Sequence, residues 1–238
     1  MNVNEIVRIV PTLKVNNRKL NERFYIETLG MKPLLEESAF ISLGDQTATE
    51  RLILEEAPSM RTRRVEGLKK LARLLIKVEN PSEIEALLSQ MKSLPRLFKG
   101  KRGYAFEIVS PEEDVILVHA EDDIRDLVPL ETVPEFYSNT SIKYVSQFEV
   151  SMELRLPEGT ESLLYPEGVA PAITFTKGQG ADLAVENNVT WDLTMLKFLV
   201  RNFDLTSLRQ KFEKTGYFVP KSEKFFLGKD TNNIESVS

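Results

Sequence analysis

The chain has 238 residues, of which 42% are hydrophobic and 28% are charged, and its formal net charge is −5 at pH 7. This composition is typical of a folded protein of about two domains and excludes the disordered and fibrous classes. The acidic balance argues against a nucleic-acid-binding protein, because such proteins neutralise phosphates with a basic surface. The sequence has no cysteine, which excludes disulfides, thiolate catalysis and thiolate metal ligands.

The amino-terminal sequence MNVNEIVRIVPTLKV lacks the basic head and long apolar core of a signal peptide. Apolar runs elsewhere are much shorter than the roughly 18 residues that would indicate a membrane-spanning helix. We therefore expect no membrane span. The same features, with the lack of cysteine, predict a cytoplasmic location.

Residues 1–121 predict two copies of one unit, in which a strand and a helix are followed by three strands. In the first copy we expect a strand at residues 6–15, a helix at 18–29 that ends at Gly30, and further extended segments at 32–42 and 50–56. In the second copy we expect a strand at residues 71–78, a helix at 80–91, a strand at 97–101 and a hairpin at 103–121.

Local signals support the second copy. Asn80 is a helix N-cap residue, Pro81 suits the first turn, and Glu83 is placed to close a capping box. The final hairpin, GYAFEIVSPEEDVILVHAE, alternates on both sides of an acidic turn at 110–114, and its second strand carries His119, the only histidine. Residues 59–70 form a basic connector, which either docks an acidic partner or is simply a solvated loop.

The composition changes to acidic, proline and small polar residues over 122–141, which we interpret as a linker. Residues 142–238 then predict a second domain, a degenerate pair of the same units. We expect strands at 144–156 and 190–200, a hairpin of 172–176 with 181–186, a helix capped by Asp204 and ended by Gly216, and strands at 217–227 and 234–237.

The repeated unit, with LKVNN before its first helix, FYIETLGMKPL leaving it and FEIVSPEEDVILV closing the pair, resembles the vicinal oxygen chelate, or glyoxalase–bleomycin-resistance, superfamily. The fold class that this resemblance implies is α+β, with paired βαβββ modules, curved mixed sheets and two domains. In that superfamily, two such modules curve their sheets into a half-barrel around a cleft.

The whole chain is also similar to the CppA proteins of Gram-positive cocci, including the stretches NFDLTSL and TWDLTMLKFL. That family is described as proteinases that degrade complement component three. The resemblance therefore implies a peptidase, complement component three as a partner, and a surface or extracellular location as an alternative to the cytoplasm.

Metal-dependent members of the superfamily place His or Glu ligands at positions that correspond here to Val10, Arg73 and Leu117. None of these side chains can chelate, since oxygen- and nitrogen-donor sites need His, Asp or Glu. We therefore expect no metal and no other cofactor in the first domain. In the second domain, Glu149, Glu153 and Glu186 are a weaker candidate for a cation site.

The same alignment predicts that one cleft of the first domain is lined by side chains that can bind a small anionic ligand: Thr12, Lys14, Arg73, Lys77 and His119. Glu55 occupies in the first unit the place that His119 occupies in the second, so the two form a candidate acid–base pair. The alternative is that His119 is a hydrogen-bonded structural residue and that the lysines solvate an open face.

The residues do not contain a recognisable peptidase site. There is no HExxH or GxSxG motif, and a Ser–His–Asp triad would have to use His119 without a nominated serine, although a Ser–Lys dyad has no local signature. Whether the chain is an enzyme is therefore open. Three functions remain: a proteinase acting on complement, a metal-free small-ligand-binding protein, and a partner-binding scaffold without catalysis.

Overall fold

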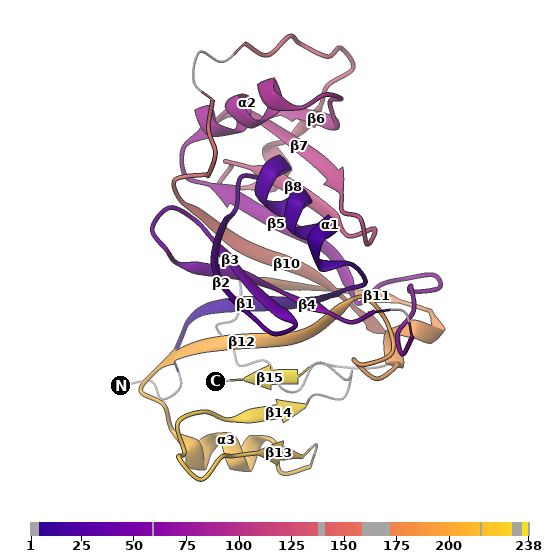
Figure 1. Ribbon diagram of the computed structural model, residues 1–238, viewed down its shortest axis with the longest axis vertical. Coiled ribbons are helices and arrows are strands. Elements are labelled where there is room, and N and C mark those ends of the chain that lie inside the picture. The colour runs from indigo at the N-terminus through magenta and orange to yellow at the C-terminus, as the bar shows by residue number, and fades with distance from the viewer. Residues whose placement is uncertain are drawn as a thin grey trace.

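Two β-sheets, each containing parallel and antiparallel strand pairs, make up most of the structure, which is a computed structural model (Figure 1). It describes residues 5–58, 60–137, 141–158, 172–214, 216–229 and 235–237. The fold is therefore mixed α+β and mostly sheet, as the sequence predicts. No helix in these ranges has both the length and the apolar character needed to cross a membrane.

The first sheet has eight strands in the order β13-β14-β15-β12-β1-β4-β3-β2. Their bounds are β1 (Glu5–Val15), β2 (Lys32–Glu37), β3 (Phe40–Gly44), β4 (Glu50–Glu56), β12 (Leu193–Arg201), β13 (Tyr217–Phe218), β14 (Leu227–Lys229) and β15 (Glu235–Val237).

The second sheet has seven strands in the order β11-β10-β5-β8-β7-β6-β9. Their bounds are β5 (Leu71–Val78), β6 (Arg96–Lys99), β7 (Tyr104–Val109), β8 (Val115–His119), β9 (Val128–Pro129), β10 (Phe148–Pro157) and β11 (Ile173–Gly178).

The helices are short and are fixed by polar caps. They are α1 (Arg18–Arg23), which continues as the π-helical turn η1 (Phe24–Thr28), then α2 (Pro81–Gln90), η2 (Ile124–Asp126), η3 (Ala181–Ala184) and α3 (Leu205–Lys211). Asn80 caps α2 and Asp204 caps α3, as predicted, because each side chain accepts a hydrogen bond from a backbone N–H of the first turn. Glu83 does not close a capping box. It binds the backbone and side chain of Ser146 instead.

Two central strand pairs join the early and late parts of the chain. Strand β1 is antiparallel to β12, and β5 is antiparallel to β10. Each sheet is therefore built from strands of both residues 1–121 and residues 142–238.

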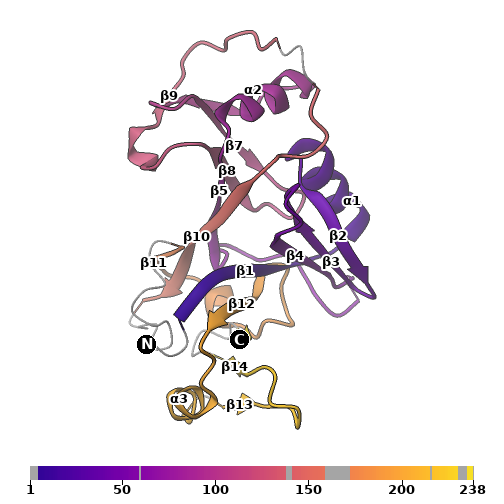
Figure 2. The ribbon, with the colours of Figure 1, turned by 90° about the vertical axis from the view of Figure 1, so that its left-hand side faces the viewer.

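The buried core follows from alternation along these strands. In β10, Phe148, Met152 and Leu154 are buried, and they align with the apolar residues of β5. Helices α1 and α2 lie on the same side of the second sheet (Figure 2), so its apolar face packs against them. Each large side chain buried in this way contributes roughly 1.5–3 kcal/mol.

Residues 32–42 are extended, as expected, but Ser38 adopts a positive φ of 53° and turns the chain there, so that the segment contributes to two strands, β2 and β3. Two predicted elements are wrong. Residues 172–176 and 181–186 do not form a hairpin. Strand β11 continues through Lys177 to Gly178 and pairs in parallel with β10, after which Ala181–Ala184 is a 3₁₀ helix. Only the ends of 217–227 form strands, β13 and the start of β14.

At two positions the basic connector pairs with carboxylates of the molecule itself. The Arg63 guanidinium donates two hydrogen bonds, of 2.8 and 2.6 Å, to the buried carboxylate of Asp182. Lys69 forms an ion pair with the buried Asp114. These charges are used inside the molecule to tie the connector to both halves of the chain.

A buried carboxylate connects the two sheets. The Asp192 carboxylate accepts two hydrogen bonds from the β5 region, from the backbone N–H of Lys70 (2.6 Å) just before the strand and from that of Leu71 (3.1 Å), its first residue. It accepts a third from the backbone N–H of Leu193 (2.8 Å) at the start of β12. The side chain is 3% exposed, and its burial raises the pKa of the carboxyl group despite these three donors. Removing the carboxylate would leave three buried N–H groups without an acceptor.

We predict that Asp192→Ala lowers the free energy of unfolding by about 3 kcal/mol or more, since each orphaned buried donor costs about 1–3 kcal/mol. Chemical denaturation followed by circular dichroism measures this loss. Asp126→Ala, which removes an ion pair with the exposed Lys101, is the matched control and should change stability by less than about 1 kcal/mol. Equal effects of the two substitutions would show that Asp192 does not tie the sheets.

Candidate functional site

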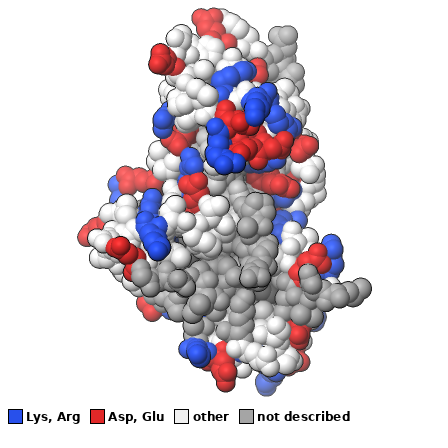
Figure 3. All heavy atoms as spheres, turned by 180° about the vertical axis from the view of Figure 1, so that it is seen from behind, with Lys and Arg blue, Asp and Glu red and all other residues white. Residues whose placement is uncertain are grey.

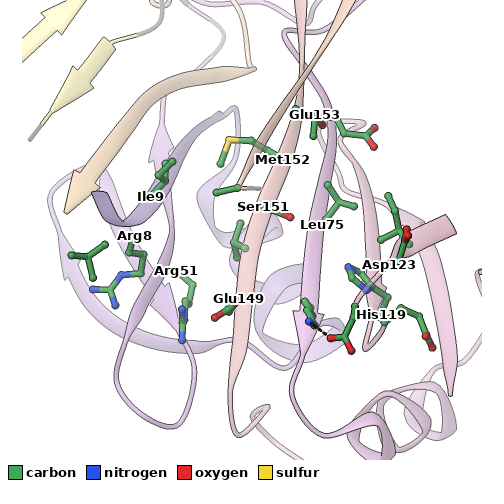
Figure 4. Close-up of a pocket in the computed structure, with 18 residues that line it drawn as sticks. Arg8, Ile9, Arg51, Leu75, His119, Asp123, Glu149, Ser151, Met152 and Glu153 are labelled. Atoms are coloured by element: carbon green, nitrogen blue, oxygen red, sulfur yellow. Dashed lines mark hydrogen bonds and ion pairs between the residues drawn. The ribbon is translucent and has the colours of Figure 1, made fainter. Parts of the chain in front are cut away.

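A cleft of about 660 Å³ lies against the second sheet, on the face opposite to α2. Its floor comes from β5, β8 and β10, and its rim from the start of β1, from Arg51 of β4 and from the segment around η2 (Figure 4). This volume falls within the range of about 300–1,000 Å³ that small-molecule sites occupy.

Strand register decides which side chains form the floor. Lys77 of β5 is aligned with His119 of β8 on one side and with Glu149 of β10 on the other. Two residues earlier in β5, Leu75 is aligned in the same way with Ser151. Because aligned residues on neighbouring strands point to the same face of a sheet, these polar side chains face the cleft while their neighbours enter the core.

His119 is the most unusual group in the cleft. Its side chain is 4% exposed, and its Nδ1 has no hydrogen-bond partner among the described residues. The pKa of the imidazole is lowered to about 4, first by burial and then by the positive charges of Lys77 and Arg73, while a hydrogen bond to the Glu121 backbone opposes the shift. His119 is therefore neutral at physiological pH.

The hydrogen bonding assigns the position of the proton on this neutral ring. A backbone contact that raises the pKa of a histidine is one in which the ring N–H donates to a carbonyl oxygen. We infer that this contact uses Nε2, because Nδ1 has no partner among the described residues. Nδ1 of His119 is then a buried hydrogen-bond acceptor on a residue of the cleft wall.

Most of the other charges in the cleft are neutralised locally. The Lys77 ammonium is 2.6 Å from a carboxylate oxygen of Asp122, and the Arg51 guanidinium is 3.0 Å from a carboxylate oxygen of Asp45. Seen from behind (Figure 3), acidic and basic side chains are intermixed over the upper half of the molecule. Neither sign of charge dominates this face.

A row of ion pairs crosses the sheet beside the cleft. Arg73 donates two hydrogen bonds to Glu153, of 3.1 and 2.7 Å, and its Nη1 lies 3.8 Å from Glu107. Arg96 Nη1 is 3.3 Å from the other oxygen of Glu107. A guanidinium therefore lies between two carboxylates at a position where metal-dependent relatives would have a ligand.

The residues at the three metal-ligand positions of the superfamily do not fit a cation. Val10 and Leu117 are buried aliphatic side chains, and Arg73 is itself a cation that already holds two carboxylates. The weaker candidate also fails, because Glu186 is paired with Lys229. Within the described part of the chain, no group of three His, Asp or Glu side chains is arranged to hold a metal ion.

The structure brings together only two of the five predicted ligand-binding residues. Lys77 and His119 line the cleft, whereas Arg73 is occupied by its ion pairs. Thr12 and Lys14 belong to the first sheet, and the Lys14 ammonium donates to the Asn187 carbonyl oxygen at 3.1 Å. The prediction of one cleft shared by all five residues is wrong, because β1 reaches the cleft only over Val7–Ile9, whereas Thr12 and Lys14 lie further along that strand.

The predicted acid–base pair of His119 and Glu55 is not formed. Glu55 lies on β4 in the first sheet and is 3.5 Å from the Lys14 ammonium, while His119 is on β8 in the second sheet. Glu55 also approaches the hydroxyl of Thr194. His119 therefore has no carboxylate partner from the matching module.

Among the cleft residues that sequence reasoning missed are two cations, Arg8 and Arg51. A signal for Arg8 was present, because it continues the alternation of Val10, Thr12 and Lys14 toward the start of β1. No local signal could place either arginine beside β10, since that proximity depends on contacts between distant segments.

Comparison with known families now places the chain. A family model described as CppA N-terminal matches residues 8–130, and one described as CppA C-terminal matches residues 145–236. The chain belongs to the CppA family. A crystal structure of the cppA protein from Streptococcus pneumoniae TIGR4 is 65% identical, with a TM-score of 0.96 over 98% of both chains. No curated protein gives a significant match.

More distant structures show the fold alone. A Bacillus subtilis subsp. subtilis str. 168 protein, named as a proposed dioxygenase, has a TM-score of 0.56 at 11% identity, over 99% of this chain and 85% of that one. A variant of glyoxalase I from Zea mays has a TM-score of 0.55 at 12% identity, over 98% and 92%. The predicted glyoxalase-like fold is confirmed.

The low pKa of His119 makes stability depend on pH. Between pH 6.5 and about 4 the unfolded chain takes up a proton on this imidazole while the folded chain does not, so stability falls as the pH is lowered through this window. A shift of this size corresponds to about 3 kcal/mol. We predict that, between pH 7 and pH 4, the free energy of unfolding falls by about 3 kcal/mol more in the wild-type protein than in the His119→Gln variant.

Urea denaturation at several pH values measures this difference, and the glutamine variant is its own control because the chain has no other histidine. Parallel pH profiles for the two proteins would show that His119 is not buried in its neutral form.

Proposed function

We propose that the protein is a metal-independent small-ligand-binding protein of the glyoxalase/bleomycin-resistance type, and that its ligand occupies the cleft over β5, β8 and β10. The observation that carries the proposal is the unpartnered Nδ1 of His119, a buried polar atom in the wall of a 660 Å³ cleft. A buried acceptor without a donor costs about 1–3 kcal/mol. A bound molecule that donates a hydrogen bond would recover this energy.

The lining also suits a small organic molecule. Apolar side chains such as Val7, Leu75 and Ile124 lie next to the polar groups that would orient a ligand. Binding sites for small molecules typically combine an apolar wall with few polar groups in this way. The row of ion pairs through Arg73 supplies the local charge balance, so binding needs no metal ion.

Proteolysis of complement component three is the alternative that the CppA resemblance implies. The cleft offers one serine, Ser151, and one histidine, but β5 lies between their strands and their alignments with β5 are two residues apart. Strands are spaced about 4.8 Å apart, so the two side chains start about 10 Å or more from each other. A serine nucleophile needs its base within about 3 Å, and this geometry therefore favours binding over cleavage.

The ligand-binding proposal is tested by a thermal-shift screen in the presence of EDTA, using free amino acids, short peptides, organic acids, nucleotides and sugar phosphates. We expect at least one class to raise the melting temperature by several degrees, because a ligand at about 100 times its Kd adds about 2.7 kcal/mol. Ser151→Phe should abolish the shift by filling the cleft floor.

Ser93→Phe is the matched control, since Ser93 is exposed and does not line the cleft. The melting temperatures of both unliganded variants show whether they are folded. The absence of a shift with every class, or an equal shift in Ser151→Phe and wild type, would refute binding in this cleft.

For the alternative, we expect no new fragments when intact human complement component three is incubated with metal-free recombinant protein and analysed by gel electrophoresis. The control is the same preparation of the His119→Ala variant. Fragments produced by wild type and lost in His119→Ala would overturn the binding proposal in favour of proteolysis.

A further inference from the structure

Arg8 is a cation in the cleft whose charge is not used by a carboxylate of the described residues. Its Nε is buried and has no hydrogen-bond partner among them. The other cleft cations differ, because Arg51 is paired with Asp45 and Lys77 with Asp122. A buried guanidinium N–H without an acceptor is costly, so the position calls for an anion.

The backbone at Arg8 is shaped to direct this side chain. The pairing of β1 with β12 runs from Ile6–Val200 directly to Arg8–Leu199, so Val7 is an extra residue that forms a bulge. Bulges of this kind re-aim side chains and are common beside functional sites. Val7 and Arg8 both line the cleft.

Glu149 is the corresponding unused anion. It is exposed in the cleft and aligned with Lys77, but Lys77 pairs with Asp122 instead. Among the described residues, none forms an ion pair or a hydrogen bond with the Glu149 carboxylate. Figure 4 shows Arg8 and Glu149 on the same side of β10, with His119 beyond β5.

These three groups define the ligand. Resting on the small-ligand function above, we propose that the cleft binds a small zwitterion, an amino acid or a short peptide, with its carboxylate on Arg8, its ammonium group on Glu149 and a hydrogen-bond donor on Nδ1 of His119. Arg is suited to the carboxylate because its planar N–H groups match both oxygens. Val7, Leu75 and Ile124 contact the apolar part of the ligand.

The strand spacing sets the size of the ligand. Glu149 and His119 lie on strands separated by β5, which places them about 10 Å apart at the backbone. A free amino acid with a short side chain reaches only the charged end of the cleft. A dipeptide, or an amino acid with a long polar side chain, also reaches His119.

The test is isothermal titration calorimetry of the full chain with glycine, glutamine and alanyl-glutamine, and with N-acetylated and carboxamide forms of alanyl-glutamine. We expect alanyl-glutamine to bind more tightly than glycine, and each blocked form to bind at least about tenfold more weakly. Arg8→Gln should remove the discrimination against the carboxamide, and Glu149→Gln the discrimination against the acetylated form.

Arg209→Gln and Glu223→Gln, which lie in an exposed ion pair outside the cleft, are matched controls and should retain both discriminations. Equal affinity for free and blocked forms in wild type, or discriminations that survive in the Arg8 and Glu149 variants, would overturn the zwitterion assignment. If another compound class still produces a cleft-dependent thermal shift, the small-ligand function stands without it. If nothing binds, both fall.

Discussion

The antiparallel pairing of β5 with β10 is the constraint on which the candidate site depends. Its register aligns Lys77 with Glu149 and Leu75 with Ser151, and it places the apolar residues of both strands on the opposite, helix-covered face. A slip of one residue would move every cleft side chain into the core and every core side chain into the cleft. The burial of Phe148, among others, therefore fixes the chemistry of the cleft as well as the fold.

This pairing also sets the arrangement of charges beside the cleft. The β5–β10 register sets Arg73 opposite Glu153, and the guanidinium reaches across to Glu107. A positive charge supplied by the chain thus balances carboxylates in a sheet that otherwise matches glyoxalase-like structures. What remains for a ligand is a polar cleft with a neutral imidazole, and with an arginine and a glutamate that have no ion-pair partner in the described part of the chain.

Local sequence signals were sufficient for much of the fold. The hairpin of β7 and β8 and the caps Asn80 and Asp204 depend on residues close in the chain, and all were predicted. The module pattern and the resemblance together identified the family and the glyoxalase-like fold. The pairing of β11 was mispredicted, because this strand pairs in parallel with the edge of β10 and no local turn signal indicates that contact.

The site was predicted only in part, for the same reason. His119 and Lys77 were found because they lie on strands of one module, where alternation shows which face each residue takes. Lys14 and Thr12 were assigned to the same cleft, but they lie in the other sheet, which β1 joins by pairing with β12 near the end of the chain. Periodicity gives the face of a strand. It does not give the strand's neighbours.

We propose that His119 presents to a ligand an unprotonated Nδ1 that has no partner among the described residues. Because the chain has one histidine, a two-bond ¹H–¹⁵N spectrum reports on the two nitrogens of this imidazole alone. We expect a neutral ring at pH 7 with the proton on Nε2, and a change in the Nδ1 shift that saturates when a cleft ligand is added. A protonated ring at pH 7, or an Nδ1 shift that does not respond to a saturating ligand, would contradict it.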